Sequence, residues 1–237
     1  MNIVFCPMRI AGVDEAGRGC VIGPLVIAGT LFDEDALPIL KEIGVRDSKK
    51  IIPKKRTKLA EKIKKIALDV NVVEIQPSVI DKVVFRSHPL RRLNYLETMI
   101  MAKVIRELDP DVVYVDAPDV DNKRCITQIS SVLKKEVDII CEHKADDKYP
   151  STGASSIIAK VIRDQRVKEL REKYGDFNSG YAHDEKTQKF ISEYFSKNKK
   201  CPDFIRASWI TVQRHLNPLK QITLESLHDP SQKDQEG

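Results

Sequence analysis

The stretch that organises the chain is IAGVDEAGRG, residues 10–19. It begins with apolar residues that predict a strand, continues with two adjacent carboxylates, Asp14 and Glu15, and ends in a Gly-Arg-Gly turn at residues 17–19. Carboxylates at a strand end suit a hard divalent cation such as magnesium, which leaves its other positions to water and phosphate oxygens. Glycines let backbone N–H groups approach a ligand where a Cβ would obstruct. The stretch therefore indicates a phosphate ester held on a metal ion.

Three other interpretations of this stretch are weaker. The spacing from Gly12 to Gly17 is that of a P-loop, but Arg18 and Gly19 replace the Lys-Ser/Thr pair, and two acids would repel the phosphates. The glycines at 17, 19 and 23 also miss the Gly-x-Gly-x-x-Gly dinucleotide fingerprint. A solvated turn with two surface acids is the simplest alternative, and further acids downstream in the chain speak against it.

Composition indicates an ordinary globular protein of 237 residues, with 41% hydrophobic and 32% charged residues. The net charge of +5 permits nucleic-acid binding without requiring it. Five cysteines, scattered and without a C-x-x-C pair, predict reduced thiols and neither a disulfide framework nor a zinc site. There is no evident signal peptide and no apolar run of membrane-spanning length, so we expect a cytoplasmic protein that does not contact a membrane.

The first part of the chain predicts antiparallel strands. Apolar runs at residues 9–13 and 21–32 are separated by too few residues for a crossover helix, so they should pair antiparallel. Helical patterns follow at residues 35–43 and 53–67, and a third strand at residues 69–75.

The second part alternates strands and helices, which predicts parallel pairing. The expected helices lie at residues 77–85, 93–108 and 123–134, and the expected strands at 112–115 and 137–141. The first of these strands ends directly in Asp116, and the second is followed by an acidic cluster at residues 142–147. Together, these elements predict an α/β fold with a mixed five-stranded sheet flanked by helices.

The last third of the chain predicts a long helix over residues 153–173, followed by polar and basic helical sequence. We therefore expect a catalytic core over residues 1–173, a C-terminal helical lobe that binds substrate over 174–220, and a disordered tail over 221–237.

Acids at three strand ends can converge only if those strands are neighbours in the sheet. Carboxylates brought together repel one another and raise at least one pKa unless cations neutralise them. Two divalent ions about 3.5–4 Å apart are the usual arrangement for hydrolysing a phosphodiester. A serine or cysteine nucleophile would need a histidine base, and the five histidines lie beside no evident nucleophile in the sequence.

Several motifs carry a family resemblance. They are GVDEAGRG at 12–19, DSKK at 47–50, YVD at 114–116, HKAD at 143–146, ASSIIAK at 154–160 with RD at 163–164, and GY at 180–181. Together they closely resemble ribonuclease HII in its archaeal form, in the same order and over roughly residues 9–215.

The resemblance implies a ribonuclease H fold and Mg²⁺- or Mn²⁺-dependent cleavage of RNA paired with DNA, with two ions in each site. Such enzymes also cut on the 5′ side of a single ribonucleotide embedded in duplex DNA, leaving a 3′-hydroxyl and a 5′-phosphate. Carried over by position, the catalytic and metal-binding carboxylates would be Asp14, Glu15, Asp116 and Asp146. The acids beside them, Asp119, Asp121 and Asp147, are interpreted as solvated loop residues.

The resemblance also assigns substrate contacts. Gly17, Arg18 and Gly19 would grip the backbone around the ribonucleotide, and Tyr181 would sense the junction between RNA and DNA. Phosphate contacts are expected from Lys49 and Lys50. A helix N-terminus near Ser156 could assist with its N–H groups.

Two alternative functions fit the sequence less well, and one partner is indicated. Ribonuclease HIII carries a large N-terminal domain, and only a few residues precede the first expected strand here. A catalytically silent nucleic-acid-binding module predicts the loss of a carboxylate, yet all four candidates are present. The segment QITLESLH, from Gln221 to His228, resembles a degenerate sliding-clamp-binding box that lacks both aromatic residues. A monomer is expected because no exposed apolar stripe is evident.

Overall fold

A five-stranded sheet lies at the centre of the computed structural model, which describes residues 7–45, 51–86 and 93–216. The strands are β1 (Arg9–Ala16), β2 (Leu25–Asp33), β3 (Asp69–Ile75), β4 (Val112–Asp116) and β5 (Asp138–Glu142). Their order is β3-β2-β1-β4-β5, with β1, β2 and β3 antiparallel and with β4 parallel to both β1 and β5. The expected mixed sheet is confirmed.

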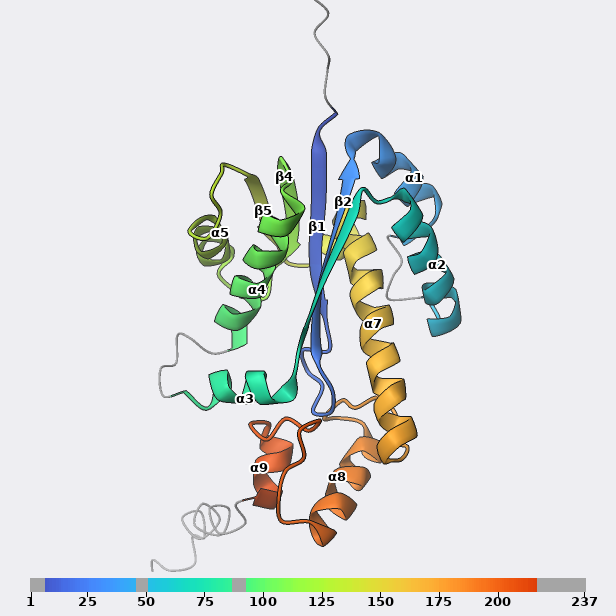
Figure 1. Cartoon of the computed structure of the whole chain (residues 1–237), viewed down its shortest axis with the longest axis vertical. Helices are drawn as coiled ribbons and strands as arrows, with labels where there is room; N and C mark the ends of the chain where they lie inside the picture. The colour runs from blue at the N-terminus through green and yellow to red at the C-terminus, as the bar shows by residue number, and fades with distance from the viewer. Residues whose placement is uncertain (1–6, 46–50, 87–92, 217–237) are drawn as a thin grey trace, which may run out of the picture.

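Helices cover both faces of this sheet (Figure 1). They are α1 (Leu37–Glu42), α2 (Pro53–Ile66), α3 (Pro77–Val84), α4 (Leu93–Leu108), α5 (Asn122–Ser130), α6 (Ala145–Lys148), α7 (Pro150–Tyr174), α8 (Glu185–Lys197) and α9 (Ile210–Leu216), with a 3₁₀ turn at Glu34–Ala36. One face packs against α4 and α5, and the other against α7 with α1 and α2. In the described ranges, no helix is long and apolar enough to cross a membrane.

The central strand β1 alternates between the two faces, as side chains on a strand do. Ala11 and Val13 enter the core beneath α4, whereas Ala16 enters the core beneath α7. Gly12 also faces α7, and there the backbones nearly touch: a Cβ on Gly12 would lie 2.1 Å from the carbonyl carbon of Ser151. The absence of a side chain at Gly12 therefore sets how closely α7 packs on β1.

The second strand starts later than the sequence predicts. Residues 21–24 precede β2 because the chain turns at Gly23, whose φ of +92° suits glycine. Short antiparallel bridges instead join Cys20 to Tyr181 and Ile22 to Ile205. The sequence marks a turn or bulge at Gly23-Pro24 in the apolar run over residues 21–32, and this turn is present. Residues 21 and 22, before it, belong with the C-terminal lobe and not with the strand.

The C-terminal lobe, which we define as the described residues 175–216, has its own small core. Buried residues of the lobe, among them Phe177 and Val212, pack with Val21, Ile22 and the end of α7. Figure 1 shows α8 and α9 at the end of the molecule below the sheet. The lobe is consequently anchored to the segment that follows the Gly-Arg-Gly turn.

Two cysteines that are distant in the sequence meet in the core. Cys125 of α5 and Cys141 of β5 are buried, and their Sγ atoms lie 2.7 Å apart. A dithiol oxidant such as diamide should therefore join them, taking up two electrons and two protons as the S–S bond forms. By closing a loop of about 15 residues, the bond should stabilise the fold by up to ~3 kcal/mol.

This oxidation is measured by the intact mass of the alkylated protein. The oxidised chain should lose two hydrogens and take up two fewer alkyl groups, and Cys125→Ala should abolish the change. Cys201→Ala, which removes a half-exposed thiol elsewhere, should leave it intact. Oxidation that persists in Cys125→Ala would contradict the expected pairing.

Candidate active site

The two acids of the central strand point to opposite faces of the sheet, because they are adjacent on β1. Asp14 is 4% exposed and faces α7. Burial raises its pKa well above the ordinary value, and the neighbouring carboxylates Glu15 and Asp116 raise it further. A hydrogen bond from Ser156 and the charge of Lys160 only partly offset this effect.

Glu15 is partly buried and faces α4, where it lies beside a second acid, Glu97. Burial is the main cause that raises the pKa of Glu15 to about 8, followed by the charges of Glu97 and Asp116. Its Oε2 atom is buried and, within the part of the chain that the structure describes, has no hydrogen-bond partner. Glu97 itself is fully buried, and burial raises its pKa to about 7.

Asp116 lies at the same level as Asp14 on the neighbouring parallel strand, since Val13 pairs with Val115. Its Oδ1 accepts a hydrogen bond of 2.9 Å from the backbone N–H of Ala145, the first residue of α6. Asp146 follows Ala145 and is 2% exposed, whereas Asp147 is exposed. The contact between β4 and α6 therefore brings the third and fourth predicted carboxylates to one end of the sheet.

These carboxylates fit a divalent cation. Buried carboxyl groups with raised pKa values and an unpartnered carboxylate oxygen are costly, and a bound cation would relieve both costs. The donors are hard oxygens, as Mg²⁺ and Mn²⁺ prefer. In residues 7–45, 51–86 and 93–216, no three His, Cys, Asp or Glu side chains are grouped closely enough to hold a metal as they stand. Binding by three of them would therefore require a change of side-chain rotamer.

The Gly-Arg-Gly turn follows β1 directly, and the protein itself holds the side chain of Arg18. The guanidinium of Arg18 donates hydrogen bonds of 2.8 Å to the carbonyl of Pro118 and 2.5 Å to Oδ1 of Asn94. It also forms an ion pair of 3.4 Å with Glu97. The side chain is thus occupied by α4 and the loop after β4, and the backbone of the turn is left to contact a ligand.

A cavity of about 380 Å³ opens beside the turn, lined by Glu15, residues 17–19, Lys160 and Tyr181. Tyr181 lies against the turn, because a Cβ added at Gly19 would be 3.7 Å from its ring. The guanidinium of Arg163 stands over the same ring, 5.1 Å from its centre. The two elements that the resemblance links to ribonucleotide recognition are therefore neighbours.

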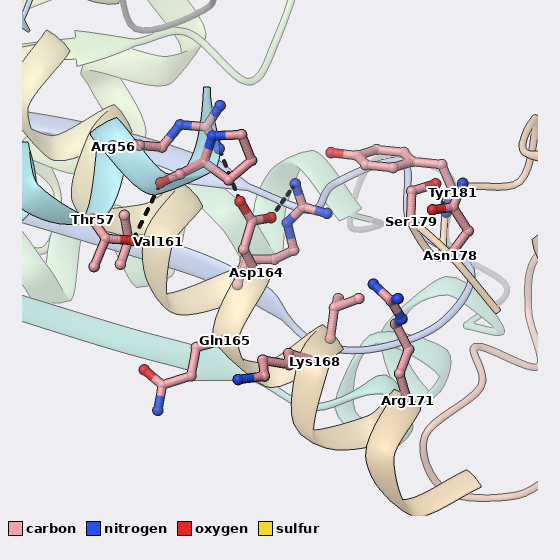
Figure 2. A pocket seen from close by; sticks show the side chains of 13 residues that line it. Arg56, Thr57, Val161, Asp164, Gln165, Lys168, Arg171, Asn178, Ser179 and Tyr181 are labelled. Atoms are coloured by element: carbon pink, nitrogen blue, oxygen red, sulfur yellow. Dashed lines mark hydrogen bonds and ion pairs between the residues drawn. The ribbon is translucent and has the colours of Figure 1, made fainter. Parts of the chain in front are cut away.

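A second cavity of about 660 Å³ continues from the first across α7, with Arg56, Arg163 and Tyr181 lining both. Figure 2 shows Tyr181 at one end of it and Arg56 at the other, with Lys168 and Arg171 along the wall. Asp164 holds Arg56 and Arg163 by ion pairs of 2.8 and 2.9 Å. The continuous surface is rich in arginine and lysine, which suits a polyanion.

Two expectations are wrong, those for Ser156 and Asp119, and two predicted residues cannot be placed. Ser156 is not at a helix N-terminus: α7 begins at Pro150, so the N–H groups near Ser156 bond within the helix, and only its hydroxyl reaches the site. Asp119 is not solvated but is 8% exposed and paired with Arg124. Asp121 and Asp147 are exposed, as expected, and Asp121 also caps α5 by accepting from the backbone N–H of Arg124. Lys49 and Lys50 lie outside the described residues.

Sequence reasoning missed two buried charges at the site, Glu97 and Arg206. A signal existed for Glu97, because it occupies the apolar stripe of α4 at helical spacing from Met101 and Ile105. No comparable pattern marks Arg206, which lies in an irregular segment between α8 and α9.

Comparison with known proteins identifies a family. The family model described as Ribonuclease HII matches residues 11–212. Ribonuclease HII of Thermococcus onnurineus is 42% identical over 207 residues, which cover 87% of this chain and 89% of that protein.

Two solved structures are also similar. The crystal structure of ribonuclease H2 from Pyrococcus horikoshii superposes with a TM-score of 0.83 at 41% identity, covering 90% of this chain and all of that one. The ribonuclease HII in the PCNA:RNase HII complex from Archaeoglobus fulgidus gives a TM-score of 0.78 at 38% identity, over 87% of this chain and 96% of that one.

Proposed function

The chain belongs to the ribonuclease HII family and is an endoribonuclease of RNA–DNA hybrids, and we propose that it also cuts duplex DNA 5′ of a single embedded ribonucleotide. The observation that carries the proposal is the adjacency of the Gly-Arg-Gly turn, the ring of Tyr181 and the partly buried Glu15 around one cavity. The products would be a 3′-hydroxyl and a 5′-phosphate.

In this proposal Asp14, Glu15, Asp116 and Asp146 are the catalytic carboxylates and hold two Mg²⁺ or Mn²⁺ ions. The chemistry that such ions supply is activation of the attacking water and stabilisation of the leaving oxygen. Support comes from the raised pKa values of Asp14 and Glu15 and from the buried Oε2 of Glu15, which has no hydrogen-bond partner within the described part of the chain. Lys160, which lines the cavity and donates to Ser156, would add positive charge beside the scissile phosphate.

Recognition of the ribonucleotide would rest on the backbone of residues 17–19. The 2′-hydroxyl is what distinguishes RNA from DNA at a given position, and both of its hydrogen-bonding roles are accessible to peptide groups. The ring of Tyr181 would pack on the sugar of the following nucleotide, where a further 2′-hydroxyl would clash. This arrangement favours a junction between one ribonucleotide and DNA.

The decisive experiment uses an end-labelled DNA duplex with one ribonucleotide, incubated with the protein and Mg²⁺ or Mn²⁺, with products mapped at nucleotide resolution. A metal-dependent cut directly 5′ of the ribonucleotide supports the proposal. Cleavage confined to long RNA–DNA hybrids would overturn the junction-sensing role of Tyr181 and the turn.

Replacing Tyr181 by alanine should lower the preference for the single-ribonucleotide duplex over a long hybrid by about tenfold, the effect of ~1.4 kcal/mol. The ratio of kcat/KM on the two substrates measures this change. Tyr174→Ala is the matched control, because Tyr174 stacks on Phe204 of the lobe and lines neither cavity. An unchanged ratio in Tyr181→Ala would contradict junction sensing by this ring.

We also propose that the segment from Gln221 to His228 binds a DNA sliding clamp. Support comes from its resemblance to a clamp-binding box and from the similar archaeal enzyme found in a complex with PCNA. The segment lies outside the described residues. Clamp immobilised on beads should retain the full chain more strongly than a chain ending at residue 220, and equal retention would exclude this segment as the binding element.

A further inference from the structure

Arg206 is fully buried, and its guanidinium contacts only backbone carbonyls among the hydrogen-bond acceptors of the described residues. It donates to the carbonyls of Gly17 at 2.7 Å, Arg18 at 2.8 Å and Gly23 at 3.2 Å. The indole of Trp209 lies beneath it, 4.8 Å away. Although burial lowers its pKa to about 10, the group stays charged at neutral pH.

The backbone around Arg206 fixes it in place. Its N–H donates to the carbonyl of Val21 at 2.8 Å, and Ile205 bridges to Ile22. On the far side, the N–H groups of Ala207 and Ser208 both donate to Asp81 of α3 at 2.9 Å. The segment is therefore tied to the core as well as to the lobe, so the guanidinium has a defined position relative to the turn.

These contacts determine which way the turn presents its peptide groups. In a trans peptide the carbonyl of one residue and the N–H of the next point in opposite directions. Because the carbonyls of Gly17 and Arg18 point to Arg206, the N–H groups of Arg18 and Gly19 point away from it. Residues 17–19 line the smaller cavity, whereas Arg206 does not. We therefore place this cavity on the side of the turn opposite Arg206, where the two N–H groups point.

Those two N–H groups are free to bind a ligand. Within the described part of the chain neither donates a hydrogen bond, whereas the N–H of Cys20 donates to the carbonyl of Gly17 at 3.2 Å. Two adjacent unpaired donors aimed at one cavity form an anion- or hydroxyl-binding group of the kind that recognises phosphate and sugar oxygens.

We propose that Arg206 is a positioning residue for cleavage at single ribonucleotides: it holds the carbonyls of Gly17 and Arg18 so that the N–H groups of Arg18 and Gly19 face the nucleic acid. This inference rests on the proposed function for its substrate. The lobe thereby takes part in recognition through the interior of the protein as well as through Tyr181.

The kinetic test is Arg206→Lys, which keeps the charge but replaces the three-pronged fork by a single nitrogen. On the single-ribonucleotide duplex, kcat should fall by roughly 100-fold, the scale that a misplacement of about 1 Å produces. This loss of kcat on the single-ribonucleotide duplex should be larger than the loss of kcat on a long RNA–DNA hybrid. The matched control is Val212→Ala, which weakens the same lobe core without touching the turn and should change neither kcat nor the substrate ratio below its melting temperature.

A measurement on the free wild-type protein keeps the proposal testable if Arg206→Lys does not fold. Amide hydrogen exchange should be fast at Arg18 and Gly19 and slow at Cys20. Equal protection of all three amides would overturn the proposal, as would a folded Arg206→Lys protein with wild-type kcat and substrate ratio. If the wild type shows this exchange pattern but leaves the single-ribonucleotide duplex uncut, the proposed function fails while the orientation of the turn by Arg206 stands.

Discussion

The Asp116→Asn protein is expected to lose cleavage of RNA–DNA hybrids by roughly a thousandfold or more, equivalent to ~4 kcal/mol of transition-state stabilisation. The reason is that the negative charge of Asp116 acts on both Asp14 and Glu15, and the amide replaces a carboxylate oxygen that is proposed to bind metal. Its shape is kept, because the Oδ1 of asparagine can still accept from the N–H of Ala145. Single-turnover cleavage with Mg²⁺ or Mn²⁺ measures the loss.

The same substitution should affect stability in the opposite direction. Asp116 raises the pKa of the neighbouring carboxyl groups of Asp14 and Glu15, so removing its charge relieves repulsion, and the metal-free protein should melt at a higher temperature. Added Mg²⁺ should stabilise the wild type by mass action and the variant much less. A variant that is inactive yet still stabilised by Mg²⁺ as strongly as the wild type would contradict the assignment of Asp116 as a ligand.

A matched pair of acids tests the fourth carboxylate in the same way. Asp146→Asn should lose activity, whereas Asp147→Asn should not, because Asp146 is 2% exposed and Asp147 is exposed. The two residues are adjacent in α6, so global effects on this short helix are shared. Equal loss in both variants would indicate that the whole helix, and not one carboxylate, is required.

The sheet could be predicted from the sequence because its strands are short apolar runs with clear ends. Asp14, Glu15 and Asp116 stood out because each follows such a run, and neighbouring strands then bring acids together. The register could not be read in the same way. The sequence predicts a first strand that ends at Val13, whereas β1 continues to Ala16. Because Asp14 and Glu15 are part of the strand, they face opposite helices, which the shorter strand does not show.

The sequence does not reveal a buried charge whose hydrogen-bond partners are backbone groups far away in the chain. Arg206 contacts Gly17 across 189 positions of the chain, and no local pattern connects them. The start of β2 differs from the apolar run for a related reason, since residues 20–22 pair with the lobe and β2 begins only at Leu25. Apolar composition alone does not show that residues 20–22 belong with the lobe.

Gly12→Ala should have the largest effect on stability, a loss of at least ~4 kcal/mol, which is exceptional for one methyl group. The new Cβ would lie 2.1–2.3 Å from three backbone atoms of Ser151 and Thr152, which cannot rotate aside as a side chain can. At ~2–4 °C per kcal/mol for a protein of this size, the melting temperature should fall by roughly 8–16 °C or the chain should fail to fold. Circular dichroism during heating measures it.

Gly19→Ala is the control that separates packing from recognition. A Cβ at Gly19 meets only the ring of Tyr181, at an ordinary 3.7 Å, so stability should stay within about 1 kcal/mol of the wild type. The methyl group would still project beside the cavity where the ribonucleotide is proposed to bind, so cleavage should fall in a fully folded protein. In this assignment Gly12 serves the contact between β1 and α7, and Gly19 serves substrate binding. Similar losses of stability in the Gly12→Ala and Gly19→Ala proteins would contradict it.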